Sequence, residues 1–401
     1  MKWYPNIARA VTEAMIAIFI RHNQADKVIN ALLKSNKKWG SRDRKFIARV
    51  LYDVVRWKIL YEYLSNDSVK TEQGRWKVLT VWSVLHEISL PDWPVFHQID
   101  KNEIIKKYQN LTDEQIKQSV PDWLFEIGNQ SLGKAVWLKE LKALNQEAAV
   151  FIRLNTLKTN RKKLLSKFDK LQIAYEEIPG QPQALKILNR TKLTGLQAYR
   201  QGCFEIQDIA SQQVAPFSGA APGMTVIDAC AGAGGKTLHL AAIMENAGQI
   251  FAYDIYESKI NELKRRIHRN GVKNVKEATV ITPEIVRKNR QKADVLLLDA
   301  PCSSLGTLRR KPGLKWELNP EKLAQINVTQ QNIINDYEQM LKIGGDLIYV
   351  TCSILPRENE EIVKSFLKTH KNYTFVDEKT VYPSRFEGDG FYMAKLKKLT
   401  T

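Results

Sequence analysis

The sequence predicts an α/β protein that carries a small α+β unit and an all-helical N-terminal region. After about residue 205, apolar strands alternate with helical stretches, which favours a mostly parallel sheet covered by helices on both faces. Before that point a few short strands surround one helix, and before residue 146 the apolar residues follow a helical period. These observations predict three domains, at residues 1–145, 146–205 and 206–401.

The N-terminal region is typical of a group of amphipathic helices. From Asp43 to Leu64 the apolar residues form one helical stripe, and most of the basic residues lie elsewhere around the helix. Prolines separate the further helical patterns, which we expect at about 76–90, 97–108 and 112–118. Two roles fit a basic helical domain of this kind: binding RNA, or only stabilising the rest of the chain.

The remaining elements follow from the change in hydrophobic period. The small unit is expected to contain strands at 149–155, 172–178 and 184–188 around a helix at 161–171. For the larger domain, the apolar runs predict strands at 225–230, 249–254, 278–282, 294–300 and 346–352, with helices at 236–245, 258–270 and 320–341. Ligands of such folds bind beyond the carboxyl ends of the strands, so we look there for chemistry.

Charge indicates a polyanionic partner. The chain has 61 Lys and Arg against 43 Asp and Glu, a net charge of +18 that is spread along its length. A surplus of this kind attracts nucleic acid, so RNA or DNA is the first partner to consider. The alternative is a basic surface that binds nothing in particular.

The four cysteines, Cys203, Cys230, Cys302 and Cys352, form no CxxC pair, and no histidine lies at zinc-ligand spacing. We therefore expect no metal site and free thiols in a reducing compartment. No segment reaches the roughly 18–20 apolar residues that span a bilayer. The first residues read as an amphipathic helix, so a cytoplasmic protein that does not contact a membrane is expected.

A glycine loop follows the first strand of the large domain, in the run Asp228-Ala-Cys-Ala-Gly-Ala-Gly-Gly-Lys-Thr237. It fails the phosphate-loop template because Cys230 stands where glycine is needed, and it fails the dinucleotide template at Thr237. Asp254 ends the next strand, 20 residues after Gly234, where an acidic side chain can accept both hydroxyls of a ribose. A cofactor with a ribose and no pyrophosphate fits, and S-adenosylmethionine is such a molecule. An ordinary glycine turn is the alternative.

Cys302 lies two residues after the apolar run 294–300, Cys352 ends the apolar run 346–352, and each cysteine precedes a serine. A single cysteine at a strand end is more often a small buried residue than a catalyst. If the two strands are neighbours, however, both thiols project into one crevice. Cys302 comes three residues after Asp299.

Two thiols in one crevice indicate a particular chemistry. Carbon 5 of a pyrimidine attacks a methyl sulfonium only after a thiolate adds to carbon 6. Asp299, either protonated or bonded to the amino group of the base, would stabilise the charge that arises at N3. A second group must then help to remove the proton on carbon 5. The residues alone do not assign the two roles to the two cysteines.

Four runs of residues and one strand-end aspartate together resemble the RsmB/Sun/nucleolar-protein family of RNA 5-methylcytosine methyltransferases. They are DACAGAGGKT, Asp254, LLLDAPCS, LRRKPGLKW and VTCSILPRENEE. The resemblance covers the chain from about 150 to the C-terminus. It implies a Rossmann-like methyltransferase domain, with Cys352 as the nucleophile, Cys302 assisting release and Asp299 as a third catalytic residue. It assigns to the cofactor Cys230, Ala231, Gly232, Ala233, Gly234, Gly235, Lys236 and Asp254, and it assigns Asp299 to the cofactor or the base. The N-terminal helices resemble a NusB-like RNA-binding domain in pattern and size.

Some positions depart from the pattern of the family. Ala233 stands where the family usually has proline, a change that we expect to be tolerated. Where the family often has an Asp beside the adenine, the segment VITPEIV offers only Glu284. Arg153 and Asn155 resemble an Arg-x-Asn element that contacts RNA or supports the core.

The sequence therefore predicts a monomeric, S-adenosylmethionine-dependent RNA (cytosine-5) methyltransferase that acts on 16S ribosomal RNA. Three alternatives stay open: a catalytically silent RNA-binding factor of ribosome assembly, a methyltransferase that acts on tRNA, and a DNA methyltransferase. A Rossmann oxidoreductase is disfavoured because the third glycine of its fingerprint is absent.

Overall fold

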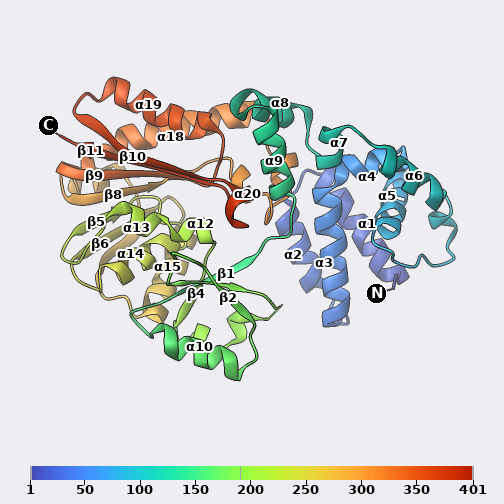
Figure 1. The fold of residues 1–401 in the computed structure, drawn as a ribbon, viewed down its shortest axis with the longest axis horizontal. Helices are drawn as coiled ribbons and strands as arrows, with labels where there is room; N and C mark the ends of the chain where they lie inside the picture. Colours follow the sequence, from blue (N-terminus) through green and yellow to red (C-terminus); the bar gives the residue numbers. More distant parts are fainter. Residues whose placement is uncertain (1, 190, 400–401) are drawn as a thin grey trace. The chain divides into compact units, whose positions relative to one another are not determined.

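The computed structural model describes residues 2–189 and 191–399, which form two compact units (Figure 1). Among the described residues, unit 1 consists of 2–146 together with 308–321, and unit 2 of 147–189, 191–307 and 322–399. Residues 308–321 fall within the range expected for the methyltransferase domain, yet they pack with the N-terminal helices. The chain therefore passes between the two units three times.

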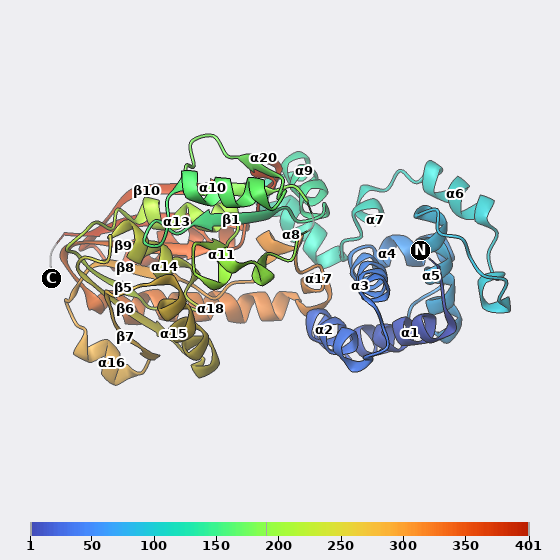
Figure 2. The ribbon, with the colours of Figure 1, turned by 90° about the horizontal axis from the view of Figure 1, so that it is seen from below.

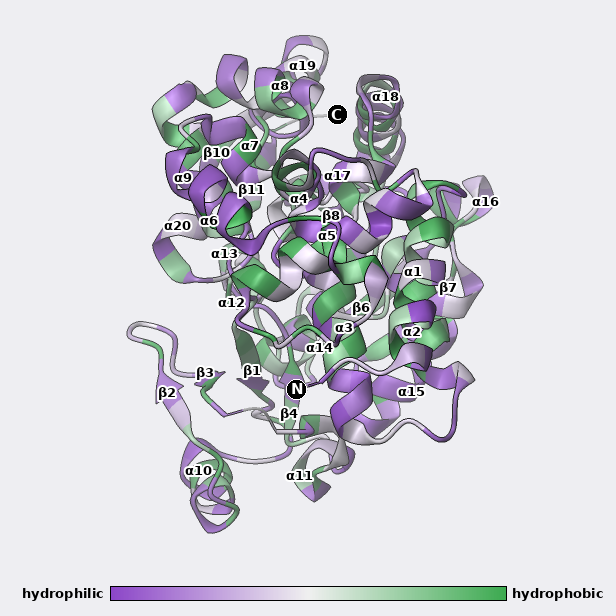
Figure 3. Ribbon diagram, turned by 90° about the vertical axis from the view of Figure 1, so that its right-hand side faces the viewer, coloured by the Kyte–Doolittle hydropathy of each residue, from purple (hydrophilic) through white to green (hydrophobic). Residues whose placement is uncertain are grey.

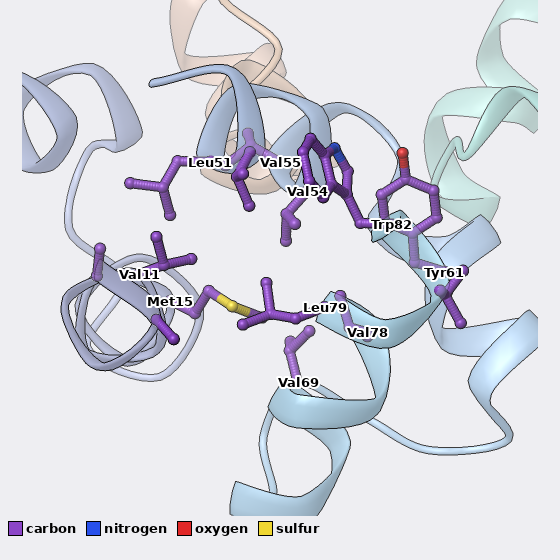
Figure 4. Packing of buried hydrophobic residues seen from close by; sticks show 14 of the residues in the cluster. Val11, Met15, Leu51, Val54, Val55, Tyr61, Val69, Val78, Leu79 and Trp82 are labelled. Atoms are coloured by element: carbon purple, nitrogen blue, oxygen red, sulfur yellow. The ribbon is translucent and has the colours of Figure 1, made fainter. Parts of the chain in front are cut away.

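Unit 1 is helical, as its apolar period predicts. Its helices are α1 (Pro5–Phe19), α2 (Ala25–Ser35), α3 (Ser41–Arg56), α4 (Lys58–Ser65), α5 (Glu72–Leu85), η1 (Pro94–Phe96), α6 (Lys101–Asn110), α7 (Glu114–Gln118), α8 (Asp122–Leu132), α9 (Lys134–Leu144) and α17 (Leu314–Glu317). Figure 4 shows their shared core, in which Val11 and Met15 of α1 face Leu51 and Val54 of α3 and Leu79 of α5. These side chains are completely or almost completely buried.

The helix expected from Asp43 to Leu64 is wrong as a single element, because it breaks at Trp57 between α3 and α4. No glycine or proline causes the break. Tertiary partners hold it instead: the carbonyl of Arg56 accepts a hydrogen bond from Lys315, and the amide of Ile59 donates to Ser119 Oγ. Contacts with distant residues thus replace two hydrogen bonds of the helical ladder.

Unit 2 contains a small antiparallel sheet in the order β2–β3–β1–β4. Its strands are β1 (Val150–Leu154), β2 (Tyr175–Glu177), β3 (Ala184–Ile187) and β4 (Phe204–Ile206). Helix α10 (Arg161–Lys170) packs on this sheet through Leu164 and Phe168, and it lies next to the sheet in both Figures 1 and 2. The short helices η2 (Leu193–Gly195) and α11 (Gln197–Arg200) lead into β4.

The large sheet of unit 2 has seven strands in the order β10–β11–β9–β8–β5–β6–β7. The five strands from β9 to β7 are parallel, and β11 and β10 add an antiparallel hairpin at one edge. Their bounds are β5 (Thr225–Asp228), β6 (Gln249–Asp254), β7 (Val275–Val280), β8 (Ala293–Asp299), β9 (Leu341–Thr351), β10 (Tyr373–Val381) and β11 (Phe391–Lys398). The α/β fold class expected from the sequence is confirmed.

Helices cover both faces of this sheet, and the alternation of buried residues shows why (Figure 1). In β8, Leu296 and Leu298 point toward one core, whereas Val295 and Leu297 point toward another. The first core is covered by α16 (Pro283–Lys288), α18 (Pro320–Tyr337) and α19 (Glu360–Thr369), and the other face by α13 (Val214–Ser218), α14 (Gly235–Ile243) and α15 (Glu257–Asn270). The remaining short helices are α12 (Ile209–Gln212), η3 (Leu305–Thr307), η4 (Glu338–Met340), η5 (Pro356–Glu358) and α20 (Pro383–Phe386).

The strand expected at 278–282 begins earlier and ends earlier, at Val275–Val280. Lys276 and Glu277 hid its start, because β7 is an edge strand and tolerates polar residues on its outer side. Thr282 caps α16 instead of continuing the strand: its side chain accepts a hydrogen bond from the amide of Ile285.

Candidate active site

The structure brings the two strand-end cysteines together. Strands β8 and β9 are parallel neighbours, and Asp299 at the end of β8 pairs in register with Val350. Cys352 directly follows β9, Cys302 lies three residues after the end of β8, and their Sγ atoms lie 3.3 Å apart. The crevice that the sequence predicts for adjacent strands therefore holds both thiols.

The two thiols are not equivalent. A hydrogen bond from Cys302 lowers the pKa of Cys352, although burial of the thiol acts to raise it. The contact with Ser304 Oγ, 3.3 Å away, and the charge of Lys236 also lower the pKa of Cys352. The same contact, together with burial, raises the pKa of Cys302 well above its usual range. Of the two side chains, Cys352 is thus the better thiolate and Cys302 the neutral donor.

One buried carboxyl group joins the two cysteine loops. Glu358 accepts hydrogen bonds from the amide of Ser303 at 2.6 Å, from Ser303 Oγ at 2.6 Å and from Ser353 Oγ at 2.5 Å. Each serine directly follows one of the cysteines, and burial raises the pKa of Glu358. The sequence argument missed Glu358, although a serine after each cysteine and the nearby run ENEE were the available signals.

Lys236 and Asp299 form an ion pair beside the thiols. Lys236 lies in the first turn of α14, and its Nζ is 2.5 Å from Asp299 Oδ2. The Lys236 side chain is 10% exposed and that of Asp299 is 30% exposed. The charge of Lys236 also reaches Cys352, where it lowers the pKa of the thiol. A cation and a carboxylate therefore face the same crevice as the two sulfur atoms.

The glycine loop between β5 and α14 is held by its own backbone and by Asp254. Gly232 and Gly234 have φ values of +54° and +86°, a region that favours glycine. Asp254 Oδ2 accepts a hydrogen bond from the amide of Gly232 at 2.8 Å. Burial raises the pKa of Cys230 well above its usual value, so the thiol within the loop is a poor nucleophile.

The loop has the features expected of a cofactor cradle. A Cβ atom added at Gly232 would meet no heavy atom within 4 Å, so a ligand has room there. Asp228 Oδ1 is buried and has no hydrogen-bond partner among the described residues. Burial also raises the pKa of Asp228 to about 7. An unsatisfied carboxyl group beside an open glycine turn suits the amino group of an amino-acid ligand.

Beyond the ends of β6 and β7 lies a hollow of about 400 Å³ whose lining includes Ile255, Ile281 and Pro283, together with Asp336. Apolar walls with a carboxylate suit an aromatic base. Glu284 does not line this hollow; its side chain is exposed and paired with Arg287. The geometry therefore does not support Glu284, the nearest candidate in the sequence, as the residue that replaces the adenine-side Asp of the family.

Arg153 and Asn155 are buried, so of the two roles open to them the structural one fits. Arg153 is 1% exposed and donates to the carbonyl of Gly235, and burial lowers its pKa to about 9. Asn155 is 3% exposed and donates to the carbonyls of Gly202 and Asn270. Both side chains fasten the small sheet to the larger domain within unit 2.

The described residues contain neither a membrane-spanning helix nor a metal-binding cluster. No helix in the described ranges is both long and apolar enough to cross a membrane. Nor do any three His, Cys, Asp or Glu side chains of residues 2–189 and 191–399 form a group that could hold a metal ion. All four cysteines are free thiols.

Comparison with known proteins places the chain in a family. Residues 219–397 match the model described as 16S rRNA methyltransferase RsmB/F, and residues 120–194 match a ferredoxin-like domain of RsmF/B-like methyltransferases. A probable ribosomal RNA small subunit methyltransferase B from Synechocystis is 31% identical over 328 residues, which cover 74% of this chain and 73% of the relative. This chain belongs to the RsmB/F methyltransferase family. A ribosomal RNA small subunit methyltransferase B from Photorhabdus laumondii is 32% identical over 69% of this chain and 66% of its own length.

Solved structures share the fold of the RsmB/F chain. A crystal structure of PH0851 is similar over 99% of this chain and 100% of its own, with a TM-score of 0.80 and 24% identity. A methyltransferase homolog protein from Pyrococcus horikoshii has a TM-score of 0.64 and 25% identity over 72% of this chain and 98% of its own. Family membership and the residues of the glycine loop agree: this chain is an S-adenosylmethionine-dependent methyltransferase.

Proposed function

We propose that this chain is an RNA (cytosine-5) methyltransferase that acts on 16S ribosomal RNA. The observation that carries the proposal is the pair of thiols 3.3 Å apart at the ends of two adjacent parallel strands. The relatives named ribosomal RNA small subunit methyltransferase B support 16S rRNA as the substrate.

In the first step, the Cys352 thiolate adds to carbon 6 of the cytosine. The electron pair of the C5–C6 double bond shifts to carbon 5 and, through the ring, to N3, so carbon 5 becomes nucleophilic and the adduct carries one negative charge until carbon 5 takes the methyl group. Asp299 orients the base by accepting a hydrogen bond from its amino group, and the Lys236 ammonium, which is paired with Asp299, offsets the charge of the adduct. The lowered pKa of Cys352 supports this choice of nucleophile, because more of the thiol is ionised at neutral pH.

When bound, S-adenosylmethionine supplies an electrophilic methyl group on a sulfonium. The loop from Cys230 to Lys236, with Asp254 and the backbone of Ala231 and Ala233, holds this cofactor in our proposal. Asp254 accepts from the ribose hydroxyls, and Asp228 accepts from the amino group through its unpaired oxygen. Asp299, at the end of β8, would contact the base or the cofactor.

Cys302 assists the last step. The Cys352 thiolate and burial together raise the pKa of Cys302, and once Cys352 is bonded to carbon 6 the first of these causes is gone, so the Cys302 proton is lost to solvent more easily. Cys302 then takes the proton on carbon 5, the ring double bond re-forms, and the Cys352 thiolate leaves. The product is 5-methylcytosine, and the second thiol returns the proton to solvent.

The proposal extends to the other domains. We propose that residues 1–145 are a NusB-like RNA-binding domain, that residues 146–205 form an RNA-binding subdomain, and that the protein works as a cytoplasmic monomer. A silent assembly factor would need neither a paired thiol nor a cofactor loop, and this chain keeps both. A tRNA substrate is the second candidate within the same chemistry.

Single cysteine variants test the mechanism. Cys302→Ala is expected to trap a covalent protein–RNA adduct with unmodified 16S rRNA, visible as a shifted band on a denaturing gel, because release is blocked. Cys352→Ala should form no adduct and transfer no tritium from labelled S-adenosylmethionine. Cys203→Ala, which changes a buried cysteine outside the crevice, is the matched control and should keep its activity.

Three results would contradict parts of the proposal. An adduct with Cys352→Ala and none with Cys302→Ala would exchange the two roles. Label found in tRNA or duplex DNA and not in 16S rRNA would reject the substrate. Label on a base other than cytosine, after nuclease digestion and chromatography, would reject the reaction.

A further inference from the structure

A hollow of about 1220 Å³ lies on the surface of unit 2, away from the cysteine crevice. Its lining residues come from the turn after β1, from α10, from the end of α11 and from the last turn of α15. None of the cofactor or catalytic residues proposed above lines it. The hollow therefore has no role in the chemistry already described.

The lining of this hollow is strongly basic. Five lysines line it: Lys158, Lys162, Lys163, Lys167 and Lys170. All five are exposed, and no ion pair to any of them is recorded within the described ranges. Arg200 adds a guanidinium group, and Arg269 adds a second one whose charge is paired with Glu205 behind the wall of the hollow. No acidic residue is among the described residues that line the hollow. Such a concentration of like charge attracts a polyanion.

The arrangement of charge on α10 argues against a merely solvated helix face. Leu164 and Phe168 bury one side of the helix against the small sheet, and Figure 3 shows hydrophilic and hydrophobic residues alternating along it. On the other side, Lys163, Lys167 and Lys170 recur at spacings of four and three residues, so their charges face one another. Repulsion of this kind destabilises a helix, and phosphate groups between the ammonium groups would relieve it.

One wall of the hollow is fixed to the cofactor loop. Arg269 pairs with the buried carboxylate of Glu205, and its guanidinium lies 4.2 Å from the ring centre of Tyr199. Glu205 also binds Arg266 at 2.8 Å, and Arg266 donates to the carbonyl of Ala233 at 2.6 Å. A strand of RNA held in this hollow is thereby held at a defined place relative to the glycine loop.

We propose that this basic hollow binds the phosphodiester backbone of the substrate RNA, at nucleotides away from the target base. The inference rests on the proposed function, which supplies RNA as the substrate. Exposed lysines contact phosphates without reading sequence, so the hollow sets affinity and orientation, and the crevice selects the base. An acidic protein partner is the competing occupant.

A charge-matched pair of triple variants of the full-length chain tests the proposal. Lys163→Gln, Lys167→Gln and Lys170→Gln together remove three charges from the hollow. Lys364→Gln, Lys368→Gln and Lys371→Gln remove three exposed charges at and just after α19, outside the hollow. Binding of an unmodified 16S rRNA transcript is measured by filter binding between 50 and 300 mM KCl. The apparent KM for the same RNA is measured alongside.

The hollow variant is expected to bind RNA about tenfold more weakly near physiological salt. Its slope of log K against log[KCl] should be less steep by roughly 2 to 3, since each lost phosphate contact removes about 0.7 to 0.9. Its KM for RNA should rise while kcat and S-adenosylmethionine affinity stay unchanged. Replacement of the same three lysines by arginine should restore binding, which excludes a misfolded helix as the cause.

Equal RNA binding by the hollow variant and the α19 variant would overturn the proposal. Unchanged binding of naked rRNA by the hollow variant would also overturn it, and this is the result expected if the hollow binds an acidic protein instead. Failure of the proposed function has a different signature. In that case the wild-type chain transfers no methyl group to 16S rRNA, whatever the two triple variants do to binding.

Discussion

Lys236 of unit 2 and Lys315 of unit 1 are both buried ammonium groups, but their surroundings differ. Lys236 is 9% exposed and pairs with the carboxylate of Asp299. Burial opposes its charge, and Asp299 outweighs burial, so the pKa of Lys236 is raised. Lys315 is 1% exposed and contacts four neutral oxygen atoms. Burial, helped by the charge of Arg56, lowers the pKa of Lys315 well below its usual range.

The oxygen atoms around Lys315 show what this second lysine does. The carbonyls of Arg56, Gln118 and Ser119 lie at the ends of α3 and α7, where a helix leaves carbonyls without partners, and Asn145 Oδ1 completes the set at 2.8 Å. Lys315 thus caps two helices and fixes segment 308–321 within unit 1. A countercharge therefore distinguishes the lysine of the reaction site, and carbonyls at helix ends distinguish the lysine that holds the fold.

The largest effect is expected from Lys315→Met, which should lower the free energy of unfolding of unit 1 by about 4 kcal/mol, because several buried oxygens lose a donor. All nine tryptophans of the chain lie in unit 1, so their fluorescence in a urea titration follows that unit alone. Lys311→Met, an exposed position in the same segment, is the control and should change stability by less than about 0.5 kcal/mol.

Lys315→Met should leave the cofactor site of unit 2 unaffected. S-adenosylmethionine affinity, measured by calorimetry, should be unchanged in Lys315→Met, because the glycine loop has its own core. If Lys315→Met proved as stable as Lys311→Met, the idea that helix-end carbonyls hold this segment would be rejected.

For Lys236→Met we expect the opposite result, a large loss of activity with a smaller loss of stability. Activity at pH 7 is expected to fall about 100-fold, since a charged group is lost from the reaction site. The charge of Lys236 lowers the pKa of Cys352, so its removal raises that pKa and moves the acid limb of the pH–rate profile to higher pH. Part of the activity should return as the pH rises. Stability should change less than in Lys315→Met, because water reaches the partly exposed Asp299.

Initial rates between pH 6 and 9, and the rate at which iodoacetamide alkylates Cys352 over the same range, measure this shift. Lys264→Met, on the exposed side of α15, is the control that should keep the wild-type profile. An unshifted profile with a large loss of rate would mean that Lys236 acts on the substrate alone and not on the thiol.

The two lysines also show where sequence reasoning ends. Lys236 could be assigned to a site through the resemblance of the run DACAGAGGKT to the cofactor loop of the family. A separate rule is that the ends of parallel strands meet at one edge of a sheet. That rule placed Asp299, Cys302 and Cys352 together. Lys315 could not be assigned, since its partners lie between 170 and 259 residues away along the chain.

Glu358 and the break at Trp57 escaped the sequence argument for the same reason. The pattern of apolar residues records burial, and it carries no information on which distant donor replaces a hydrogen bond of a helix. Glu358 resembles any polar residue after a strand until Ser303, 55 positions earlier, is seen to donate to it. Local periodicity predicts helices, strands and their approximate ends, whereas the polar contacts between these elements can be identified only in the folded structure.

The smallest effect is expected at Glu358, the buried carboxyl group that ties together the loops of both cysteines. Glu358→Ala should reduce kcat roughly tenfold or more by loosening the spacing of Cys302 and Cys352. The KM for S-adenosylmethionine should not change, because the glycine loop is untouched. Glu358→Gln keeps an oxygen that can accept from the Ser303 amide and should recover much of the loss.

Initial-rate kinetics with both substrates varied separate kcat from KM, and Glu361→Gln, at an exposed neighbour, is the control. A general loss of folding would lower kcat and the fraction of protein that binds cofactor together, whereas a positioning role lowers kcat alone.

Burial raises the pKa of Glu358, so the folded chain binds the proton of this carboxyl group more tightly than the unfolded chain does. The stability that this proton contributes is present at low pH and is lost as the pH rises through the folded pKa. Glu358→Gln, which cannot titrate, should therefore be the less pH-sensitive protein, and equal pH dependence in the two would show that this carboxyl group is not held as the structure places it.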